Sequence, residues 1–584
     1  MGPRSLSVRL LALLGALVLP ACTTTLPAGP ASQAVPAAAP ASPSVYERGM
    51  VSAADPRAAE AGAEMLRQGG SATDAAIATM LALTVVEPQS SGIGGGGFYV
   101  HADAEGRIDT LDGRETAPRA ATPGRFLDPQ GSPLPFRQAV VGGLSVGVPA
   151  NIALAAKAHA RDGKLAWARL FAPAIKLARE GYALTPRGHR ALAQRPDVAG
   201  HDPAARALYY GADGAPVPVG TTIRNPALAR TLEAVANNGP DAFYKGTLAQ
   251  EIAGKVAAQT PQDGKMTAKD IRTYVAKERP APCGTYRVYR ICGMGPPSSG
   301  QTTVIAILGA LENFDMAGLG PDSPVAWHVF AEAQRLAYAD RDKYLADSDF
   351  VPVPLAGLLD PAYLRERGRA ISPERTMAAV QAGHPAGSQS LSLAIGPRQP
   401  ESGTSHFVAV DRAGHVVSYT STIESAFGSG VFVGGFYLNN ELTDFSFAPS
   451  KDGVPVANRV EGGKRPRSSM APTLVYGPDG KLVLAVGAAG GATIPVQVAR
   501  ALIGVLDWKL TVDQALALPV LFSPGDTVTI EKGTRLEAMK PALEKLGHTV
   551  RVGELPLKAN AIAVVAGQLV GAGDPRSEGR AVFE

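Results

Sequence analysis

The stretch Glu401-Ser402-Gly403-Thr404-Ser405-His406-Phe407 lies where the composition of the chain changes. Before it, from about residue 378, Gly, Ser, Pro and Gln dominate, which indicates a loop or linker. After it, 405–410 and 415–422 have the composition of two strands joined by the turn residues 411–414. Thr404 therefore stands where a polar loop meets a strong strand. Its hydroxyl is a poor nucleophile until a nearby base takes its proton.

Upstream of this stretch, two helix starts are marked by capping residues. Asp55-Pro56 predicts a helix that ends at Gly69-Gly70, and Ser71 with Asp74 forms a capping-box pattern that opens a second, apolar helix to about Val86. The middle of the chain, from about 150 to 380, is mostly helical by periodicity, with 326–345 as its clearest case.

Downstream, a second strand pair is predicted at 474–476 and 481–486, and helices follow at about 495–507 and 535–546. The order of these elements, in which helices come first and hairpin strands follow, predicts a layered α+β fold with mainly antiparallel sheets.

The overall composition excludes several classes of protein. The chain has 584 residues, 45% of them hydrophobic, and a formal net charge of +4. Such a chain buries a large core and is neither disordered nor a polytopic membrane protein. The nearly balanced charge argues against a nucleic-acid binder. The nine histidines and three cysteines form no recognisable ligand motif, so no metal site is expected.

The first residues have the pattern of an export signal. Arg4 and Arg9 precede a short apolar run over 10–19, and Ala21-Cys22 resembles a bacterial lipobox, in which cleavage leaves Cys22 as a lipidated N-terminus. We expect a signal peptide over 1–21, an Ala/Pro-rich tether over 22–44, and a periplasmic protein anchored to the outer membrane. An ordinary signal cleaved nearby is the alternative.

Export bears on the two remaining cysteines. Cys283 and Cys292 flank a strand-like run over 285–291. An oxidising compartment permits a disulfide between them, but only if the chain folds back over this short span.

Two glycine-containing patterns suggest other functions. The run 92–97 satisfies G-x-G-x-x-G, but a helical pattern precedes it and a strand follows, which is the reverse of a dinucleotide site. Gly143-Leu144-Ser145-Val146-Gly147 matches the nucleophile elbow of serine hydrolases, with strand character at 138–141 and a helix from about Pro149. Pro149 biases the preceding residue toward extended geometry, so a serine hydrolase using Ser145 is only a weaker alternative.

Several segments follow one another along the chain: Gly94 to Phe98, Leu111-Asp112-Gly113-Arg114-Glu115, Gly403-Thr404-Ser405-His406, Thr420-Ser421-Thr422-Ile423-Glu424, Leu438-Asn439-Asn440-Glu441-Leu442-Thr443-Asp444-Phe445-Ser446, Lys464-Arg465-Pro466-Arg467-Ser468-Ser469-Met470 and Gly490-Gly491. With these segments in this order, the chain resembles the γ-glutamyltranspeptidases (γ-glutamyltransferases), which are N-terminal-nucleophile hydrolases. The resemblance runs from about residue 45 to the C-terminus.

This resemblance implies a four-layer αββα sandwich and a precursor that cuts itself between Gly403 and Thr404. The products would be a large subunit, 45–403, and a small subunit, 404–584. The cut would give Thr404 an α-amine whose ordinary pKa, near 8, suits a general base. Thr422 would hydrogen-bond the Thr404 hydroxyl, and Gly490-Gly491 would form the oxyanion hole.

The resemblance also implies a pocket with both signs of charge for a γ-glutamyl group. Arg114, with the hydroxyls of Ser468 and Ser469, would bind the α-carboxylate. Glu441 and Asp444 would bind the α-ammonium. Glu424 stands where better-known members have Asn, which predicts a more acidic ammonium site. The segment 447–463, which forms a lid in the family, is short and has no tyrosine.

The implied activity is that of a γ-glutamyltransferase and glutathione hydrolase, with no cofactor. Thr404 would take the γ-glutamyl group from glutathione or another γ-glutamyl amide and pass it to water, an amino acid or a peptide. Family members that remove glutaryl side chains from cephalosporins make an amide acylase the main alternative. The acids of the pocket argue against that alternative, because a glutaryl group has no amine.

Overall fold

The computed structural model describes residues 44–261, 263–396 and 403–584. Its centre is a pair of antiparallel sheets. One sheet has seven strands in the order β22 (Arg580–Phe583), β1 (Met50–Ala53), β9 (Ser405–Val410), β10 (Val416–Thr422), β2 (Gly96–Ala102), β3 (Ile108–Gly113) and β6 (Lys277–Arg279). The other has six, in the order β21 (Gln568–Gly573), β20 (Lys558–Val565), β16 (Leu482–Ala489), β15 (Thr473–Tyr476), β8 (Tyr289–Gly293) and β7 (Cys283–Tyr286).

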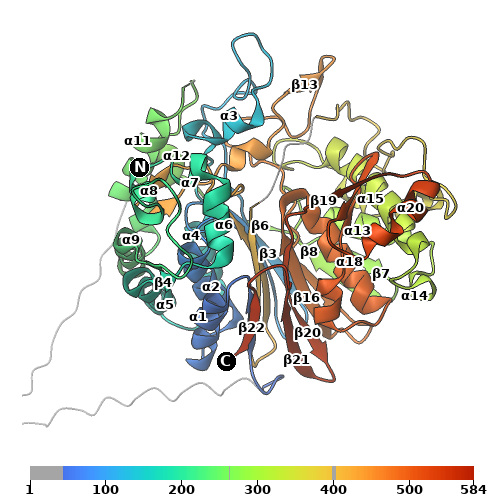
Figure 1. Ribbon diagram of the computed structural model, residues 1–584, viewed down its shortest axis with the longest axis horizontal. Helices are drawn as coiled ribbons and strands as arrows, with labels where there is room; N and C mark the ends of the chain where they lie inside the picture. The colour runs from blue at the N-terminus through green and yellow to red at the C-terminus, as the bar shows by residue number, and fades with distance from the viewer. Residues whose placement is uncertain (1–43, 262, 397–402) are drawn as a thin grey trace, which may run out of the picture. The chain divides into compact units, whose positions relative to one another are not determined.

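Helices cover the outer face of each sheet, so that Figure 1 shows helices, two sheets and helices side by side. The seven-stranded sheet is covered by α1 (Pro56–Arg67), α2 (Ala72–Val86) and α4 (Asn151–Asp162). The six-stranded sheet is covered by α13 (Gly300–Leu311), α18 (Ile494–Leu506) and α19 (Val512–Ala517). The predicted four-layer α+β architecture is confirmed.

The remaining elements lie around these layers. The helices are α3 (Phe136–Val140), α5 (Trp167–Glu180), α6 (Pro186–Gln194), α7 (Pro196–Ala199), α8 (Pro203–Tyr209), α9 (Pro226–Asn238), α10 (Asp241–Tyr244), α11 (Thr247–Ala258), α12 (Ala268–Arg272), α14 (Met316–Leu319), α15 (Pro324–Tyr344), α16 (Leu355–Leu358), α17 (Pro361–Arg369) and α20 (Leu536–Lys545). The short strands are β4 (Tyr182–Ala183), β5 (Thr222–Ile223), β11 (Phe432–Val433), β12 (Phe436–Tyr437), β13 (Ser450–Lys451), β14 (Val454–Pro455), β17 (Leu521–Phe522), β18 (Thr527–Glu531) and β19 (Thr549–Gly553).

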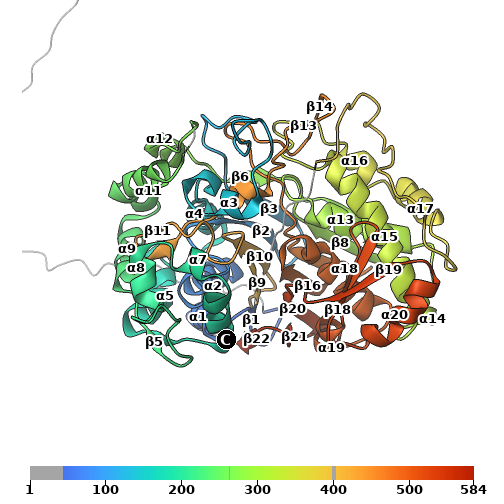
Figure 2. The ribbon, with the colours of Figure 1, turned by 45° about the horizontal axis from the view of Figure 1, so that its top comes forward.

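Strand β9 shows why the layers form. Its residues alternate between two cores: Phe407 and Ala409 pack with the helices over the seven-stranded sheet, whereas Val408 and Val410 pack against the six-stranded sheet. Both faces of β9 are therefore buried, and β9 and β10 lie against β16 and β20 in the interior (Figure 2). Each sheet takes strands from both sides of residue 403, so the two predicted subunits are interleaved.

Most predicted elements are confirmed. Asp55 caps α1, and Ser71 with Asp74 forms a complete capping box at α2. Two predictions are wrong. Residues 136–140 form the helix α3 instead of a strand. The run 285–291 is the hairpin β7–β8, because Arg287 takes a positive φ of 55° at the turn and reverses the chain.

That reversal brings the two cysteines together. Cys283 and Cys292 are directly opposite in the β7–β8 register and are joined by a disulfide.

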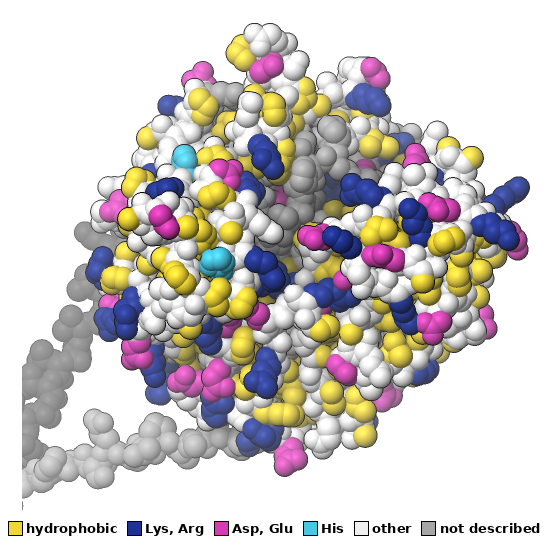
Figure 3. Space-filling model, in the orientation of Figure 1, with side chains coloured by type: hydrophobic (Ala, Val, Ile, Leu, Met, Phe, Trp, Pro, Cys, Tyr) yellow, Lys and Arg dark blue, Asp and Glu magenta, His cyan; other side chains and the backbone are white. Residues whose placement is uncertain are grey.

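The described part of the chain contains no helix that is both long and apolar enough to cross a bilayer. On the face shown in Figure 3, basic and acidic side chains are interspersed instead of forming one field.

The glycine run 92–97 has a packing role that the sequence pattern did not reveal. A Cβ on Gly95 would lie 1.9 Å from the carbonyl oxygen of Thr422, and one on Gly94 would lie 2.0 Å from that of Tyr437. These contacts leave room only for glycine, so the run lets the start of β2 approach the end of β10.

We predict that Gly95→Ala lowers the melting temperature strongly, because backbone next to Thr422 must move to admit the methyl group. Gly254→Ala is the matched control, since that helical glycine has nothing within 4 Å of the added Cβ. The control should be neutral or stabilising by about 0.5–1 kcal/mol. Thermal unfolding of both variants checks this, and equal melting temperatures would contradict the packing argument.

Candidate active site

Thr404 directly precedes β9, and its hydroxyl meets a second threonine on the neighbouring strand. The Thr404 Oγ1 atom donates to Thr422 Oγ1 at 3.1 Å, and the latter also accepts from the backbone N–H of Glu424 at 2.8 Å. The backbone N–H of Thr404 donates to the carbonyl of Ser90 at 3.0 Å. Both threonines are buried. The antiparallel pairing of β9 with β10 produces this contact, as predicted for Thr422.

The backbone at Thr404 is strained. Its φ is 105°, a region that a β-branched residue rarely adopts and that costs about 1–3 kcal/mol. The preceding residue can only be glycine, because a Cβ on Gly403 would lie 1.5 Å from the carbonyl oxygen of Glu424. The Gly403–Thr404 peptide bond is thus held in an unfavourable conformation beside a hydroxyl group.

The Gly490-Gly491 pair lies between β16 and α18. Gly490 has a φ of 122° and Gly491 a φ of 58°, and the chain passes through the 3₁₀ turn η3 (Gly491–Thr493) into α18. A Cβ on Gly490 would lie 1.8 Å from the carbonyl oxygen of Pro556. Backbone N–H groups at the start of a helix favour negative charge, which suits the predicted oxyanion hole.

Arg114 is buried among the acids predicted to share its pocket. Its guanidinium pairs with Glu441 and Asp444 and also donates to the carbonyls of Pro466, at 3.1 Å, and Arg467, at 3.0 Å. Burial alone would lower the pKa of Arg114, but the two carboxylates outweigh it and hold the pKa above its ordinary value. The residues predicted to bind opposite ends of a ligand therefore pair with one another in this structure.

Glu115 does not line this pocket, but its buried carboxyl group acts electrostatically on Arg114 and Glu441. Burial raises the pKa of Glu115 to about 8, although Arg114 opposes the shift. Burial also raises the pKa of Glu441 well above its ordinary value, and Glu115 adds to that. Glu424 accepts from the amide of Asn440 at 2.8 Å and contacts the Ser425 hydroxyl. Three acids, Glu441, Asp444 and Glu115, thus act on the one guanidinium of Arg114.

Glu115 has no role predicted from the sequence, although it lies directly after Arg114 in the quoted segment. Arg341 of α15 was not predicted either, and its guanidinium donates to Ser469 Oγ at 2.5 Å and to Ser299 Oγ at 2.9 Å. Adjacency to Arg114 is a signal that would have found Glu115. No local signal marks Arg341, because its contact with Ser469 is made only by tertiary folding.

The predicted residues enclose one small cavity of about 10 Å³. Its lining contains nearly every predicted site residue: Arg114, Gly403, Thr404, Thr422, Glu424, Glu441, Asp444, Ser468, Ser469 and Gly491, together with Met470 and Ile494. Gly490 is adjacent to this lining. A volume of this size holds about one water molecule. With the Gly403–Thr404 bond intact, a γ-glutamyl group does not fit.

The segment 447–463 contains the short hairpin β13–β14. Phe447 at its start stacks on Phe126 with ring centroids 4.3 Å apart.

Ser145 does not form a nucleophile elbow. It lies in the 3₁₀ turn η1 (Gly143–Ser145), is fully buried, and its hydroxyl donates to the carbonyl of Val140 at 2.5 Å. The preceding element is a helix and not the strand that such an elbow needs. Cys22 and the predicted signal peptide lie outside the described residues.

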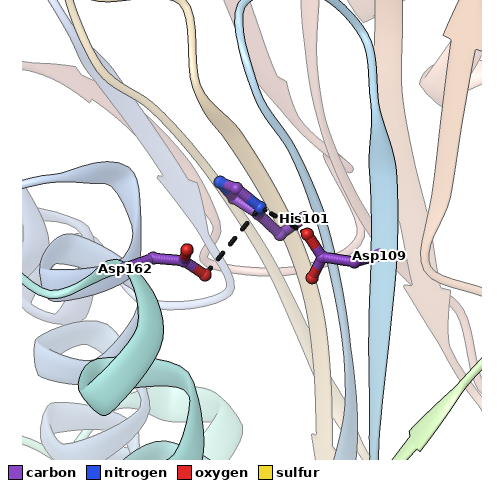
Figure 4. Close-up of side chains that lie close together, drawn as sticks. All are labelled: His101, Asp109 and Asp162. Atoms are coloured by element: carbon purple, nitrogen blue, oxygen red, sulfur yellow. Dashed lines mark hydrogen bonds and ion pairs between the residues drawn. The ribbon is translucent and has the colours of Figure 1, made fainter.

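One cluster elsewhere has the composition of a metal site. The side chains of His101, Asp109 and Asp162 converge, with ligand atoms within 4.8 Å of one another (Figure 4). His101 Nδ1 lies 3.1 Å from Asp109, and Arg161 pairs with both aspartates. The guanidinium already pairs with both carboxylates, so an ion-pair network explains the cluster.

Comparison with known proteins agrees with this geometry. The family profile described as gamma-glutamyltranspeptidase matches residues 58–583. The chain is 36% identical over 551 residues to a "Glutathione hydrolase proenzyme" of Escherichia coli strain K12, which covers 91% of each chain. It is 38% identical over 490 residues to a protein of the same name from Bacillus subtilis strain 168, which covers 82% of this chain and 81% of that one.

Among solved structures, a cephalosporin acylase from Bacillus halodurans superposes with a TM-score of 0.79 and 26% identity, covering 95% of this chain and 98% of the other. The match of the family profile, the two relatives and the threonine pair at the start of β9 lead to one conclusion: this chain belongs to the γ-glutamyltranspeptidase family.

Proposed function

We propose that the chain is a precursor that cuts itself between Gly403 and Thr404 and then acts as a γ-glutamyltranspeptidase and glutathione hydrolase. The contact between Thr404 Oγ1 and Thr422 Oγ1 beside a strained peptide bond carries this proposal. Attack of the hydroxyl on the Gly403 carbonyl moves the acyl group from nitrogen to oxygen. Water then hydrolyses the ester and leaves an amine on Thr404 and a carboxylate on Gly403.

The freed amine supplies the base that the precursor lacks. It takes the proton of the Thr404 hydroxyl, directly or through water, as Oγ1 attacks the γ-carbonyl of the donor. The negative charge that develops on the carbonyl oxygen faces Gly490-Gly491, where each N–H donor contributes about 3–4 kcal/mol. The proton passes to the leaving amine, and water, an amino acid or a peptide then removes the acyl group from Thr404.

The charged pocket favours a zwitterionic acyl group. A γ-glutamyl carboxylate takes over the Arg114 guanidinium, and its ammonium takes over Glu441 and Asp444, so the donor exchanges ion pairs that the protein already makes. The relatives named glutathione hydrolases support glutathione as a donor.

The similarity to a cephalosporin acylase keeps a glutaryl amide acylase as the alternative. The pairing of Arg114 with Glu441 and Asp444 disfavours it, because a glutaryl group that displaces these acids from the guanidinium brings no ammonium to replace that partner.

We further propose that the protein is exported and anchored in the outer membrane through a lipid on Cys22. The apolar run over 10–19 followed by Ala21-Cys22 supports this, and so does the disulfide between Cys283 and Cys292, since such bonds persist in oxidising compartments.

Substitution of the nucleophile tests the precursor mechanism. Thr404→Ala should give one uncut chain without activity, whereas Thr404→Ser, which keeps a hydroxyl, should still cut itself into fragments of about 39 and 19 kDa on a denaturing gel. Ser145→Ala should behave like the unaltered protein. Turnover by an uncut Thr404→Ala chain would contradict the mechanism.

Paired substrates test the choice of donor. We expect faster release from a γ-glutamyl anilide than from the matching glutaryl anilide, because only the former has an ammonium group. Asp444→Asn should raise KM for the γ-glutamyl anilide at least tenfold through the loss of a buried charge pair. Its effect on the glutaryl substrate should be small or favourable. A wild-type preference for the glutaryl anilide would support the acylase instead.

Anchoring is tested by fractionation of cells that express the full chain. The protein should incorporate labelled palmitate and remain in the membrane fraction, and Cys22→Ser should abolish the label and release the protein. Label that persists on the Cys22→Ser protein would exclude this lipid site.

A further inference from the structure

A buried ion pair lies directly behind the nucleophile, outside the donor cavity. Lys558, the first residue of β20, is 1% exposed, and Glu87, which follows α2, is equally buried. Their side chains meet, with Lys558 Nζ 2.8 Å from Glu87 Oε2. Neither residue belongs to the cavity lining or to the mechanism described above. An ion pair this deeply buried contributes little to the free energy of unfolding, because the cost of removing both charges from water offsets their attraction. Stability alone therefore does not explain why the pair is present.

The pair contacts two residues that hold Thr404. Lys558 Nζ donates to Ser405 Oγ at 3.2 Å and to Ser90 Oγ at 3.3 Å, and the Ser405 hydroxyl donates to Glu87 Oε2 at 2.6 Å. Ser405 follows the nucleophile in the chain. Ser90 supplies the carbonyl that accepts from the Thr404 nitrogen at 3.0 Å and from Ile423 N at 3.3 Å. That nitrogen is the atom that becomes the α-amine when the Gly403–Thr404 bond is cut.

The pair also reaches the other side of the site. Lys558 pairs with Ala489 in the β16–β20 register, directly before Gly490, and its N–H donates to Gln497 Oε1 at 3.2 Å. Gln497 in turn donates to the Ala489 carbonyl at 2.7 Å. One residue thus connects the base and the oxyanion turn. Because Glu87 and Lys558 fall on opposite sides of the cut, their pairing also joins the two fragments.

We infer that Glu87 and Lys558 are positioning residues for the nucleophile, which hold its α-amine on the Ser90 carbonyl and set the electric field in which that amine titrates. This inference rests on the proposed role of the α-amine as base.

The charges around the pair define its electrostatic effect. Burial would raise the pKa of Glu87, but Lys558 and Arg187 of α6 outweigh this and lower it. Burial lowers the pKa of Lys558 to about 8; Glu87 and Asp55 oppose the shift, and Arg187 adds to it. Arg187 Nε lies 3.8 Å from Glu87 Oε1. On β9, His406 is neutral, because burial lowers its pKa to about 3.

Three variants of the cut enzyme separate positioning from stability. The first variant, Lys558→Arg, keeps both charges. The cation-only variant combines Glu87→Gln with Lys558→Arg and keeps the positive charge alone. The uncharged variant combines Glu87→Gln with Lys558→Met and removes both charges. Glu332→Gln is the matched control, since Glu332 forms a buried pair with Arg335 at 2.9 Å on α15, away from the nucleophile. Each preparation is first checked by intact mass for a fragment that begins at Thr404.

The measurement is the pH dependence of kcat/KM on its acid limb, which reports the base of the free enzyme. A nearby cation disfavours the ammonium form of the Thr404 α-amine and therefore lowers its pKa. The acid limb of the cation-only variant should therefore lie at lower pH than the acid limb of the uncharged variant. We expect a separation of about one pH unit, the effect of one charge at roughly 10 Å in an effective dielectric of about 20. The uncharged variant should lose about tenfold or more in kcat, with KM within twofold.

The inference would be overturned if the acid limbs of the cation-only and uncharged variants coincide and the uncharged variant loses no more kcat than Glu332→Gln does. Should the uncharged variant fail to mature, Ser405→Ala gives a second test, since it removes only the hydroxyl between the pair and the nucleophile. It should lower kcat at unchanged KM, and an unchanged kcat would also overturn the inference. A fragment that begins elsewhere than at Thr404 would instead refute the proposed function and is detected separately.

Discussion

The hydrogen bond between the hydroxyls of Thr404 and Thr422 depends on the antiparallel pairing of β9 with β10, and the rest of the site is arranged around it. Layers of helices and a second sheet bury both faces of β9, which fixes the position of the strand end. The glycines at the start of β2 allow the close approach that this pairing needs. Thr404, which directly precedes the fully buried strand β9, therefore has little freedom to move.

Charge is concentrated on both sides of this threonine. In front of it, Arg114 is surrounded by carboxyl groups in a cavity too small for a donor while the chain is uncut. Behind it, Lys558 and Glu87 form an ion pair that reaches its neighbours through serine hydroxyls. In our proposal, the first arrangement selects the acyl group and the second orients the base. The two are separated by the strand end that carries the nucleophile.

Much of this could be predicted from the sequence. Capping residues located α1 and α2, and two strand-like runs joined by the turn residues 411–414 located β9 and β10. The resemblance to a family supplied Thr422, Arg114 and the glycine pair. Local patterns failed at the β7–β8 turn, where a positive φ at Arg287 reverses an apparently continuous strand. They also could not show Glu87 with Lys558, which meet only through folding across 471 residues of chain.

The account depends on one broken peptide bond, and sequencing the N-terminus of the smaller polypeptide from active, purified protein tests it most directly. The account predicts that this polypeptide begins Thr404-Ser405-His406-Phe407. A smaller polypeptide that begins at any other residue, or active protein that remains one chain, would contradict it.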